Sequence, residues 1–159
     1  MRIPFRKMEG AGNDYVFVDA LRTPFPLERG GELARRWSDR HFGIGSDGLI
    51  VLTAGTAAPV RMHMWNADGS RGAMCGNGLR CLAVLAHEHG HLRERRFAVQ
   101  TDAGVRRVEL LDGGLVRTSM GAVEVEPPQR FDVDGRELLL WRGNAGNPHA
   151  TTFVADVDT

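Results

Sequence analysis

No segment limits the choice of fold as strongly as residues 79–89, whose spacing of apolar side chains predicts a helix. Within it, residues 82–86 (LAVLA) are apolar around the whole circumference and not only along one stripe. A helix of this kind has no polar face to turn toward water, so other elements must surround it. Gly90 follows as a residue that readily ends a helix. We therefore expect a buried helix at the centre of the domain.

The other segments mostly predict short strands that can enclose this helix. Alternating or continuous apolar runs between glycine-rich turns are typical of strands. The predicted strands are residues 2–8, 15–19, 49–52, 60–65, 95–100, 105–111, 115–119, 137–142 and 151–155. A further helix is predicted over residues 28–39, where Leu33 and Trp37 share one face. The fold class is therefore α+β, with antiparallel sheets wrapped around a central buried helix.

Charge and composition exclude several classes of function. The chain has 20 basic and 20 acidic residues, so no net positive field draws it to nucleic acid or to an anionic membrane surface. It has no apolar run long enough for a transmembrane helix, and its N-terminal residues lack the apolar stretch of a signal peptide. We expect a cytoplasmic protein that keeps its two cysteines as thiols. Lys7 is the single lysine, which leaves one candidate for pyridoxal phosphate chemistry.

The densest chemical motif spans residues 66–81 (NADGSRGAMCGNGLRC). Cys75 lies just before the predicted helix, where the positive end of the helix dipole favours a thiolate. The free N–H groups of Gly76, Asn77 and Gly78 form a site for an anion such as a carboxylate. This arrangement indicates acid–base or nucleophilic chemistry on an amino acid or a similar acid. The alternative is that Cys75 is a small buried hydrophobic residue.

Several other cysteine, histidine and asparagine residues could take part in a site, but each also has a structural explanation. Cys81 lies inside the helix and is interpreted as core, and it cannot share a face with Cys75. His87 and His91 are four residues apart and could share a metal ion, but we favour a polar helix end and predict no metal site. The segment around Asn147 and His149 is either a turn or part of a site.

Five separated segments resemble the diaminopimelate epimerase family, in the order in which that family carries them. They are residues 7–15 (KMEGAGNDY), 43–48 (GIGSDG), 66–70 (NADGS), 74–81 (MCGNGLRC) and 146–149 (GNPH). The segments span nearly the whole chain. The resemblance implies the fold of that family and an enzyme that converts LL-diaminopimelate to meso-diaminopimelate in lysine biosynthesis, without pyridoxal phosphate, metal or any other cofactor.

The resemblance also assigns residues to roles. It implies two cysteines on opposite sides of the substrate α-carbon, one removing the α-proton as a thiolate and one reprotonating the other face as a thiol. Cys75 matches the first cysteine, and His149 matches a residue close to the reaction centre. The positions that match substrate-binding residues are Asn13, Asn66, Gly76, Asn77 and Asn147. Two other readings stay open, namely a different cofactor-independent amino-acid racemase and a non-catalytic module that binds a carboxylate or an amino acid.

The sequence also departs from the family pattern. The family carries a second half with a second cysteine-headed helix, and this sequence ends before it. We therefore expect one domain over residues 1–122 and, over residues 123–159, the first strands of a second, truncated pseudo-symmetric domain. We expect the 159-residue chain to supply one half of the site and to be inactive alone. The full-length enzyme is expected to form a homodimer. Gly48 stands where some members carry a side-chain amide.

Overall fold

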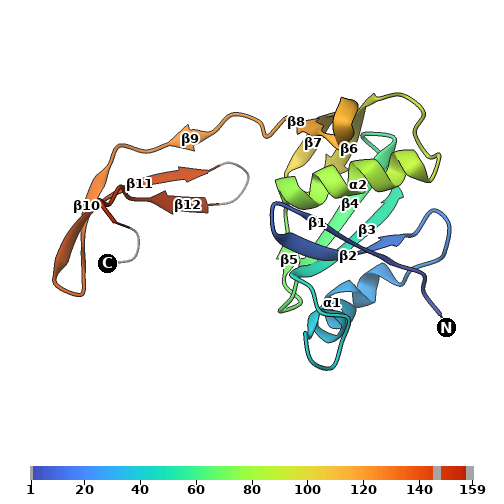
Figure 1. The fold of residues 1–159 in the computed structure, drawn as a ribbon, viewed down its shortest axis with the longest axis horizontal. Helices are drawn as coiled ribbons and strands as arrows, with labels where there is room; N and C mark the ends of the chain where they lie inside the picture. Colours follow the sequence, from blue (N-terminus) through green and yellow to red (C-terminus); the bar gives the residue numbers. More distant parts are fainter. Residues whose placement is uncertain (1, 145–147, 157–159) are drawn as a thin grey trace. The chain divides into compact units, whose positions relative to one another are not determined.

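The computed structural model describes residues 2–144 and 148–156, and the chain divides into two units, Met1–Ser119 and Met120–Thr159 (Figure 1). Each unit has its own secondary structure and is described by itself. None of the helices in the described ranges has the length and apolar character needed to cross a membrane.

The first unit is built on one mixed sheet of eight strands with two α-helices (Figure 1). Its strand order is β1-β2-β3-β4-β6-β7-β8, and β5 pairs with β4. The strands are β1 (Arg6–Gly10), β2 (Asn13–Asp19), β3 (Gly48–Ala54), β4 (Val60–Asn66), β5 (Arg71–Gly72), β6 (Arg96–Thr101), β7 (Gly104–Leu110) and β8 (Val116–Thr118). The helices are α1 (Gly30–Ser38) and α2 (Gly76–Glu88), with short 3-10 turns at Leu27–Arg29 and Asp112–Gly114. The predicted first strand, residues 2–8, is shorter than expected, because it begins four residues later and ends two residues later.

Two pairs of strands in this sheet are parallel, which the expectation of antiparallel sheets did not include. β2 runs parallel to β3, and β4 runs parallel to β6. Parallel neighbours need a crossover connection, and the two helices supply it: α1 lies between β2 and β3 in the chain, and α2 between β4 and β6. The remaining pairs are antiparallel. The predicted α+β class is confirmed, with a mixed sheet in place of an antiparallel one.

The central strands are buried on both faces, because a helix covers each face. Tyr15 and Phe17 belong to the larger apolar cluster with α2, whereas the intervening Val16 and Val18 belong to a second cluster with Leu33 of α1. Side chains that alternate along a strand point to opposite faces of the sheet. These strands therefore read as continuous apolar runs rather than as alternating ones.

Helix α2 is enclosed as its sequence predicts, except along one edge. It contacts β1, β2, β3, β7 and β8, which curl around it. Leu79, Leu82 and Leu85 are at most 1% exposed. Val84 and Arg80 are only partly buried and lie on the less covered edge. The enclosing strands hold the N-terminus of α2 next to the ends of β1 and β2, where the candidate site lies.

The second unit is a small antiparallel sheet. Its strands are β9 (Glu124–Val125), β10 (Gln129–Val133), β11 (Arg136–Asn144) and β12 (Pro148–Thr151). Asp134 and Gly135 both have positive φ angles, 53° and 76°, as a two-residue hairpin turn requires. The sequence-based prediction missed β10 because residues 129–133 carry few apolar side chains. It also placed the last strand at residues 151–155, three residues later than β12.

Candidate active site

The candidate site is centred on Cys75, the N-cap residue of α2. Cys75 has extended backbone angles, φ −129° and ψ 122°, and its carbonyl oxygen accepts the first helical hydrogen bond from the Leu79 N–H at 2.8 Å. Its thiol is free and partly exposed. The next three residues, Gly76, Asn77 and Gly78, carry the first backbone N–H groups of the helix, which have no acceptor within the helix itself. A thiol and a set of N–H donors therefore lie at the same helix end.

Glycine at position 78 lets this helix end approach the sheet closely. A Cβ at Gly78 would lie 2.4 Å from Cδ1 of Ile50 on β3 and 3.8 Å from Cβ of Cys75. Contacts below 3.0 Å require a shift of one partner, so a larger residue would displace either the end of the buried Ile50 side chain or the start of α2. Glycine at position 78 thus lets the helix start, and with it Cys75, lie against Ile50 of β3 without a shift of either partner.

Two asparagines predicted to bind substrate lie in direct contact. Nδ2 of Asn77 donates a hydrogen bond to Oδ1 of Asn13 at 2.6 Å. Nδ2 of Asn13 in turn donates to Oδ2 of Asp47 at 3.2 Å, and the guanidinium of Arg80 donates to Oδ1 of Asn77. The start of β2 and the first turn of α2 are therefore joined by an ordered chain of polar groups.

Asp47 organises this edge of the sheet, although the motif analysis did not single it out. Its Oδ2 also accepts a hydrogen bond from the Asp14 backbone N–H at 3.1 Å. Its Oδ1 accepts one from Nη2 of Arg40 at 2.9 Å. Hydrogen bonds from Arg40 and Lys7 lower the pKa of the neighbouring Asp14 carboxyl to about 2. Asp47 lies in the recognised segment 43–48, but a carboxylate in a glycine-rich turn is more often a turn former, so its role was not distinguishable.

Asn66 ends β4 at the same edge of the sheet as the start of β2. In the strand register, Tyr15 of β2 is opposite Gly48 of β3, and Gly48 is opposite Asn66. Nδ2 of Asn66 donates to Oγ of Ser70 at 2.9 Å. A Cβ at Gly48 would lie 2.2 Å from the carbonyl oxygen of Trp65 and 3.1 Å from the ring of Tyr15, so this backbone has no room for a side chain there.

Tyr15 is a buried neighbour of Cys75 that the sequence analysis did not identify. Burial, and a hydrogen bond with the Cys75 side chain, raise the pKa of Tyr15 well above its ordinary value. The phenol is therefore neutral throughout the physiological range and its O–H can donate to the sulfur. A tyrosine within an apolar strand is typical of core packing, so the sequence carried no signal for this contact.

A family model described as Diaminopimelate epimerase matches residues 5–126. The chain belongs to the diaminopimelate epimerase family. It is 39% identical to a diaminopimelate epimerase of Geobacillus thermodenitrificans, over 97% of this chain and 59% of that protein. It is 41% identical to one of Aromatoleum aromaticum, over 99% of this chain and 61% of that protein. The chain thus spans about three-fifths of the length of these curated relatives.

Solved structures share the fold of this family member at low sequence identity. A probable proline racemase from Agrobacterium radiobacter superposes with a TM-score of 0.73 at 18% identity, over 99% of this chain and 54% of that one. A PhzF-family phenazine biosynthesis protein from Bacillus anthracis gives a TM-score of 0.70 at 18% identity, over 98% and 56%. Likeness at this identity supports the fold.

The second cysteine of this diaminopimelate epimerase family member is a core residue. Cys81 is 7% exposed and belongs to the cluster between α2 and the sheet. Its Sγ donates to the carbonyl oxygen of Glu9 at 3.3 Å, and burial raises the pKa of the thiol. Both cysteines are free thiols.

Two predicted site residues lie in the second unit of the chain. His149 is an exposed residue of β12 and is opposite Gly143 of β11. Asn147 lies outside the described residues. The catalytic role assigned to His149 and the binding role assigned to Asn147 therefore stay predictions.

The three histidines at the other end of α2 do not make the pair that their spacing offered. Nδ1 of His87 is 3.0 Å from the carbonyl oxygen of Leu92. His89 and His91 instead converge on the carboxylate of Asp19 at the end of β2. Burial opposes ionisation of Asp19, but hydrogen bonds with His89 and His91 bring its pKa below the ordinary value.

Proposed function

We propose that this chain forms the Cys75-bearing half of the active site of a diaminopimelate epimerase, which interconverts LL- and meso-diaminopimelate. The observation that carries the proposal is the position of Cys75, a free and partly exposed thiol at the start of α2, with unshared backbone N–H groups beside it. Membership of the diaminopimelate epimerase family gives the substrate class. The names of the relatives supply the substrate itself.

The reaction is a proton transfer that needs no cofactor. The Cys75 thiolate takes the α-proton of the amino acid and becomes a thiol, and the electron pair of the C–H bond stays on the substrate, delocalised into the carboxylate. A second thiol then gives its proton to the opposite face of the α-carbon and becomes a thiolate. Backbone N–H groups of Gly76 and Asn77 stabilise the charge that develops on the carboxylate, since donors held in place need no reorganisation.

The side chains around Cys75 have supporting roles in this proposal. The hydroxyl of Tyr15 donates a hydrogen bond to the sulfur. The paired amides of Asn13 and Asn77, together with Asn66, offer donors and acceptors to the polar groups of the substrate without adding a charge.

The second thiol of the reaction does not come from Cys81. Its sulfur is buried in the core and its S–H is donated to the carbonyl oxygen of Glu9. We therefore propose that the second cysteine lies outside these 159 residues, and that the whole enzyme works in the cytoplasm, in lysine biosynthesis, as a homodimer. His149 is proposed to lie near the reaction centre and Asn147 to bind substrate.

The test is stereoinversion in deuterated water. The 159-residue chain is incubated with LL-diaminopimelate, and meso product and α-deuterium are measured by chiral chromatography and mass spectrometry. We expect neither from the chain alone. We expect both when the remaining part of a diaminopimelate epimerase relative is fused to it, with loss in Cys75→Ala and retention in the matched control Cys81→Ala.

Four outcomes would decide against the proposal. Inversion by the 159-residue chain alone would show that the reaction does not require a thiol from outside these residues. Activity of the fused Cys75→Ala protein would remove Cys75 from the reaction. Inversion of another amino acid in preference to diaminopimelate, or calorimetric binding without turnover in the fused protein, would favour a different racemase or a binding module.

A further inference from the structure

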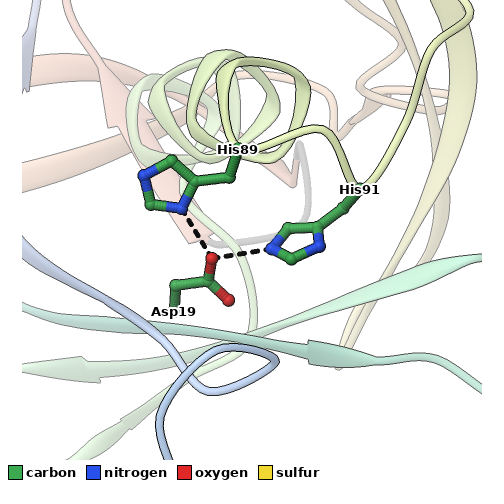
Figure 2. Close-up of side chains that lie close together, drawn as sticks. All are labelled: Asp19, His89 and His91. Atoms are coloured by element: carbon green, nitrogen blue, oxygen red, sulfur yellow. Dashed lines mark hydrogen bonds and ion pairs between the residues drawn. The ribbon is translucent and has the colours of Figure 1, made fainter.

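The end of α2 opposite Cys75 brings three metal-binding side chains together. Nδ1 of His89 lies 2.6 Å from Oδ2 of Asp19, and Nε2 of His91 lies 2.7 Å from the same oxygen (Figure 2). The three ligand atoms all lie within 4.8 Å of one another. The two imidazole rings meet at 71° with their centroids 6.1 Å apart, so they point at one oxygen instead of stacking.

The backbone produces this convergence through the way the helix ends. Gly90 has a positive φ of 77°, its N–H donates to the His87 carbonyl oxygen, and the N–H of His91 donates to the Ala86 carbonyl oxygen. These two bonds form the glycine-dependent motif that reverses the chain at a helix end. The reversal places His91 beside His89, although the two residues would lie on different faces of a continuing helix. The cluster is therefore held by regular structure.

We propose that Asp19, His89 and His91 bind a divalent transition-metal ion of the zinc class. Two imidazoles and one carboxylate form a common protein ligand set for zinc and for other first-row divalent ions, with remaining positions open to water. Magnesium and calcium prefer sites made of several oxygen ligands, so the donor set selects against them.

The carboxylate is oriented for this role. Oδ1 of Asp19 accepts the Leu21 backbone N–H at 3.0 Å, which directs Oδ2 toward the two imidazoles. Outer hydrogen bonds of this kind fix metal ligands in place. A tetrahedral zinc ion separates its nitrogen and oxygen ligands by about 3.4 Å, so the rings need to retreat by less than about 1 Å. The ion takes the place of the hydrogen bonds between nitrogen and oxygen, and each imidazole binds it through an unprotonated nitrogen.

The cluster is enclosed but can be reached from solvent. The Asp19 side chain is 7% exposed, that of His89 22% and that of His91 18%. A hollow of about 350 Å³ lies beside it and is lined by Asp19, His89, Phe5, Phe17 and Arg22 among others. This hollow gives an ion a way in and leaves room for a water ligand.

Arg22 is the group that opposes the ion. Its Nε lies 3.7 Å from Oδ2 of Asp19, and its Nη2 donates to the His89 carbonyl oxygen at 2.7 Å. The guanidinium balances the carboxylate charge in the ion-free protein and repels a cation that enters. Because the Arg22 side chain is 54% exposed, water and salt screen this repulsion. Removing the charge of Arg22 therefore strengthens metal binding.

The proposed ion is structural rather than catalytic. Cys75 and His89 lie at opposite ends of α2, about 20 Å apart at 1.5 Å per residue. The ion joins the end of α2, and the segment that follows, to the end of β2. An ion that binds only the folded state raises the stability of the fold in proportion to its occupancy.

The proposal is tested with tag-free 159-residue chain in the Cys75→Ala background, which removes the competing thiol. Zinc is titrated by calorimetry, cobalt absorption reports the ligand field, and thermal unfolding is followed with and without zinc. We expect one zinc equivalent per chain and a higher melting temperature with zinc. His89→Gln and His91→Gln should each weaken binding at least about tenfold, as the loss of one ligand predicts. Arg22→Gln should tighten it, and the exposed control His41→Gln should match the parent.

Several results would overturn the proposal. These are the absence of saturable zinc binding, binding that His91→Gln leaves unchanged, weaker binding in Arg22→Gln, or equal affinity for magnesium. Thermal unfolding of the ion-free variants checks that each is folded before its affinity is compared with that of the parent.

Discussion

The side-chain amide of Asn77, in the first turn of α2, donates a hydrogen bond of 2.6 Å to Oδ1 of Asn13 at the start of β2. The two residues are 64 positions apart in the chain. Each has a further polar partner, Asp47 for Asn13 and Arg80 for Asn77. The bond therefore fixes both amides before a substrate arrives, and it links the strand edge to the helix end that carries Cys75.

A double-mutant cycle measures this link. We expect Asn13→Ala and Asn77→Ala to lower the free energy of unfolding by less in combination than the sum of the single changes. The expected coupling is about 1 kcal/mol, because the second substitution removes a partner that is already lost. Urea unfolding of the four proteins gives the value. The control pair Asn66→Ala with Asn77→Ala should be additive, since Asn66 bonds to Ser70; equal coupling in both pairs would contradict the prediction.

The two thiols are expected to differ in reactivity. Cys75 is partly exposed, whereas Cys81 is buried, donates its S–H to Glu9 and has a pKa raised by burial. Iodoacetamide should therefore modify Cys75 at least about tenfold faster than Cys81, because only an accessible thiolate reacts. Peptide mass spectrometry over time gives both rates. In the Cys75→Ala variant, Cys81 should stay unmodified until urea unfolds the chain. In the parent protein, modification of Cys81 before Cys75 would refute the assignment of Cys81 to the core and Cys75 to the site.

The main elements could be predicted from local patterns, but the way they meet could not. The apolar run at residues 82–86 identified α2, although the helix begins at Gly76, three residues before the predicted start at residue 79. The parallel pairing of β2 with β3 was missed, because apolar pattern gives the burial of a strand and not the direction of its neighbour. The strand β10 was missed because its exposed sequence resembles a loop.

The two polar clusters show the same limit at the level of single residues. Asn13 and Asn77 were both named, but only the fold brings them into contact across 64 positions. The histidine spacing offered His87 with His91 as a possible pair, and a polar helix end without a metal was preferred. Instead, Gly90 reverses the chain and brings His91 to His89 and Asp19. Asp19 lies 70 positions from His89, so no local pattern could have supplied the third member of the cluster.

The free energy of unfolding is expected to decrease as the pH is lowered, because His63 on β4 titrates. Burial, together with the charges of Arg71 and Arg61, lowers the pKa of His63 to about 4 from an ordinary 6.5. Between pH 6.5 and 4, His63 is therefore protonated in the unfolded chain but mostly neutral in the folded chain. The free energy of unfolding should decrease by about 2 to 3 kcal/mol between pH 6.5 and 4 from this group, and level off below pH 4.

The measurement for His63 is urea unfolding across that range, with His63→Gln as the comparison. A glutamine side chain can still accept a hydrogen bond from Arg71 and donate one to Thr53, the two partners of the imidazole. Unlike histidine, it does not titrate. The difference between the two proteins should shrink as pH falls. The Asp14 carboxyl, whose pKa is about 2, acts in a separate window below pH 3.8. Parallel pH profiles for the two proteins would contradict the prediction.

The close approach of α2 to β3 makes Gly78 and Ile50 a coupled pair. Alanine is favoured over glycine in a helix by about 1 kcal/mol, so Gly78→Ala would stabilise α2 if the space allowed it. A Cβ at position 78 would lie only 2.4 Å from Cδ1 of Ile50, and because Ile50 is fully buried we expect relieving that contact to cost more than the propensity gain. We expect a net loss of about 1 to 3 kcal/mol in the free energy of unfolding.

Ile50→Val removes the Cδ1 atom that causes this contact. Alone, it should destabilise the fold by about 1 kcal/mol, because it leaves a small cavity. In the Gly78→Ala background it should instead restore stability, since the new methyl group fills the space that Cδ1 leaves. Urea unfolding of the single and double variants decides the matter. Additive losses would mean that the helix start is not held against Ile50, and that Cys75 is placed by other contacts.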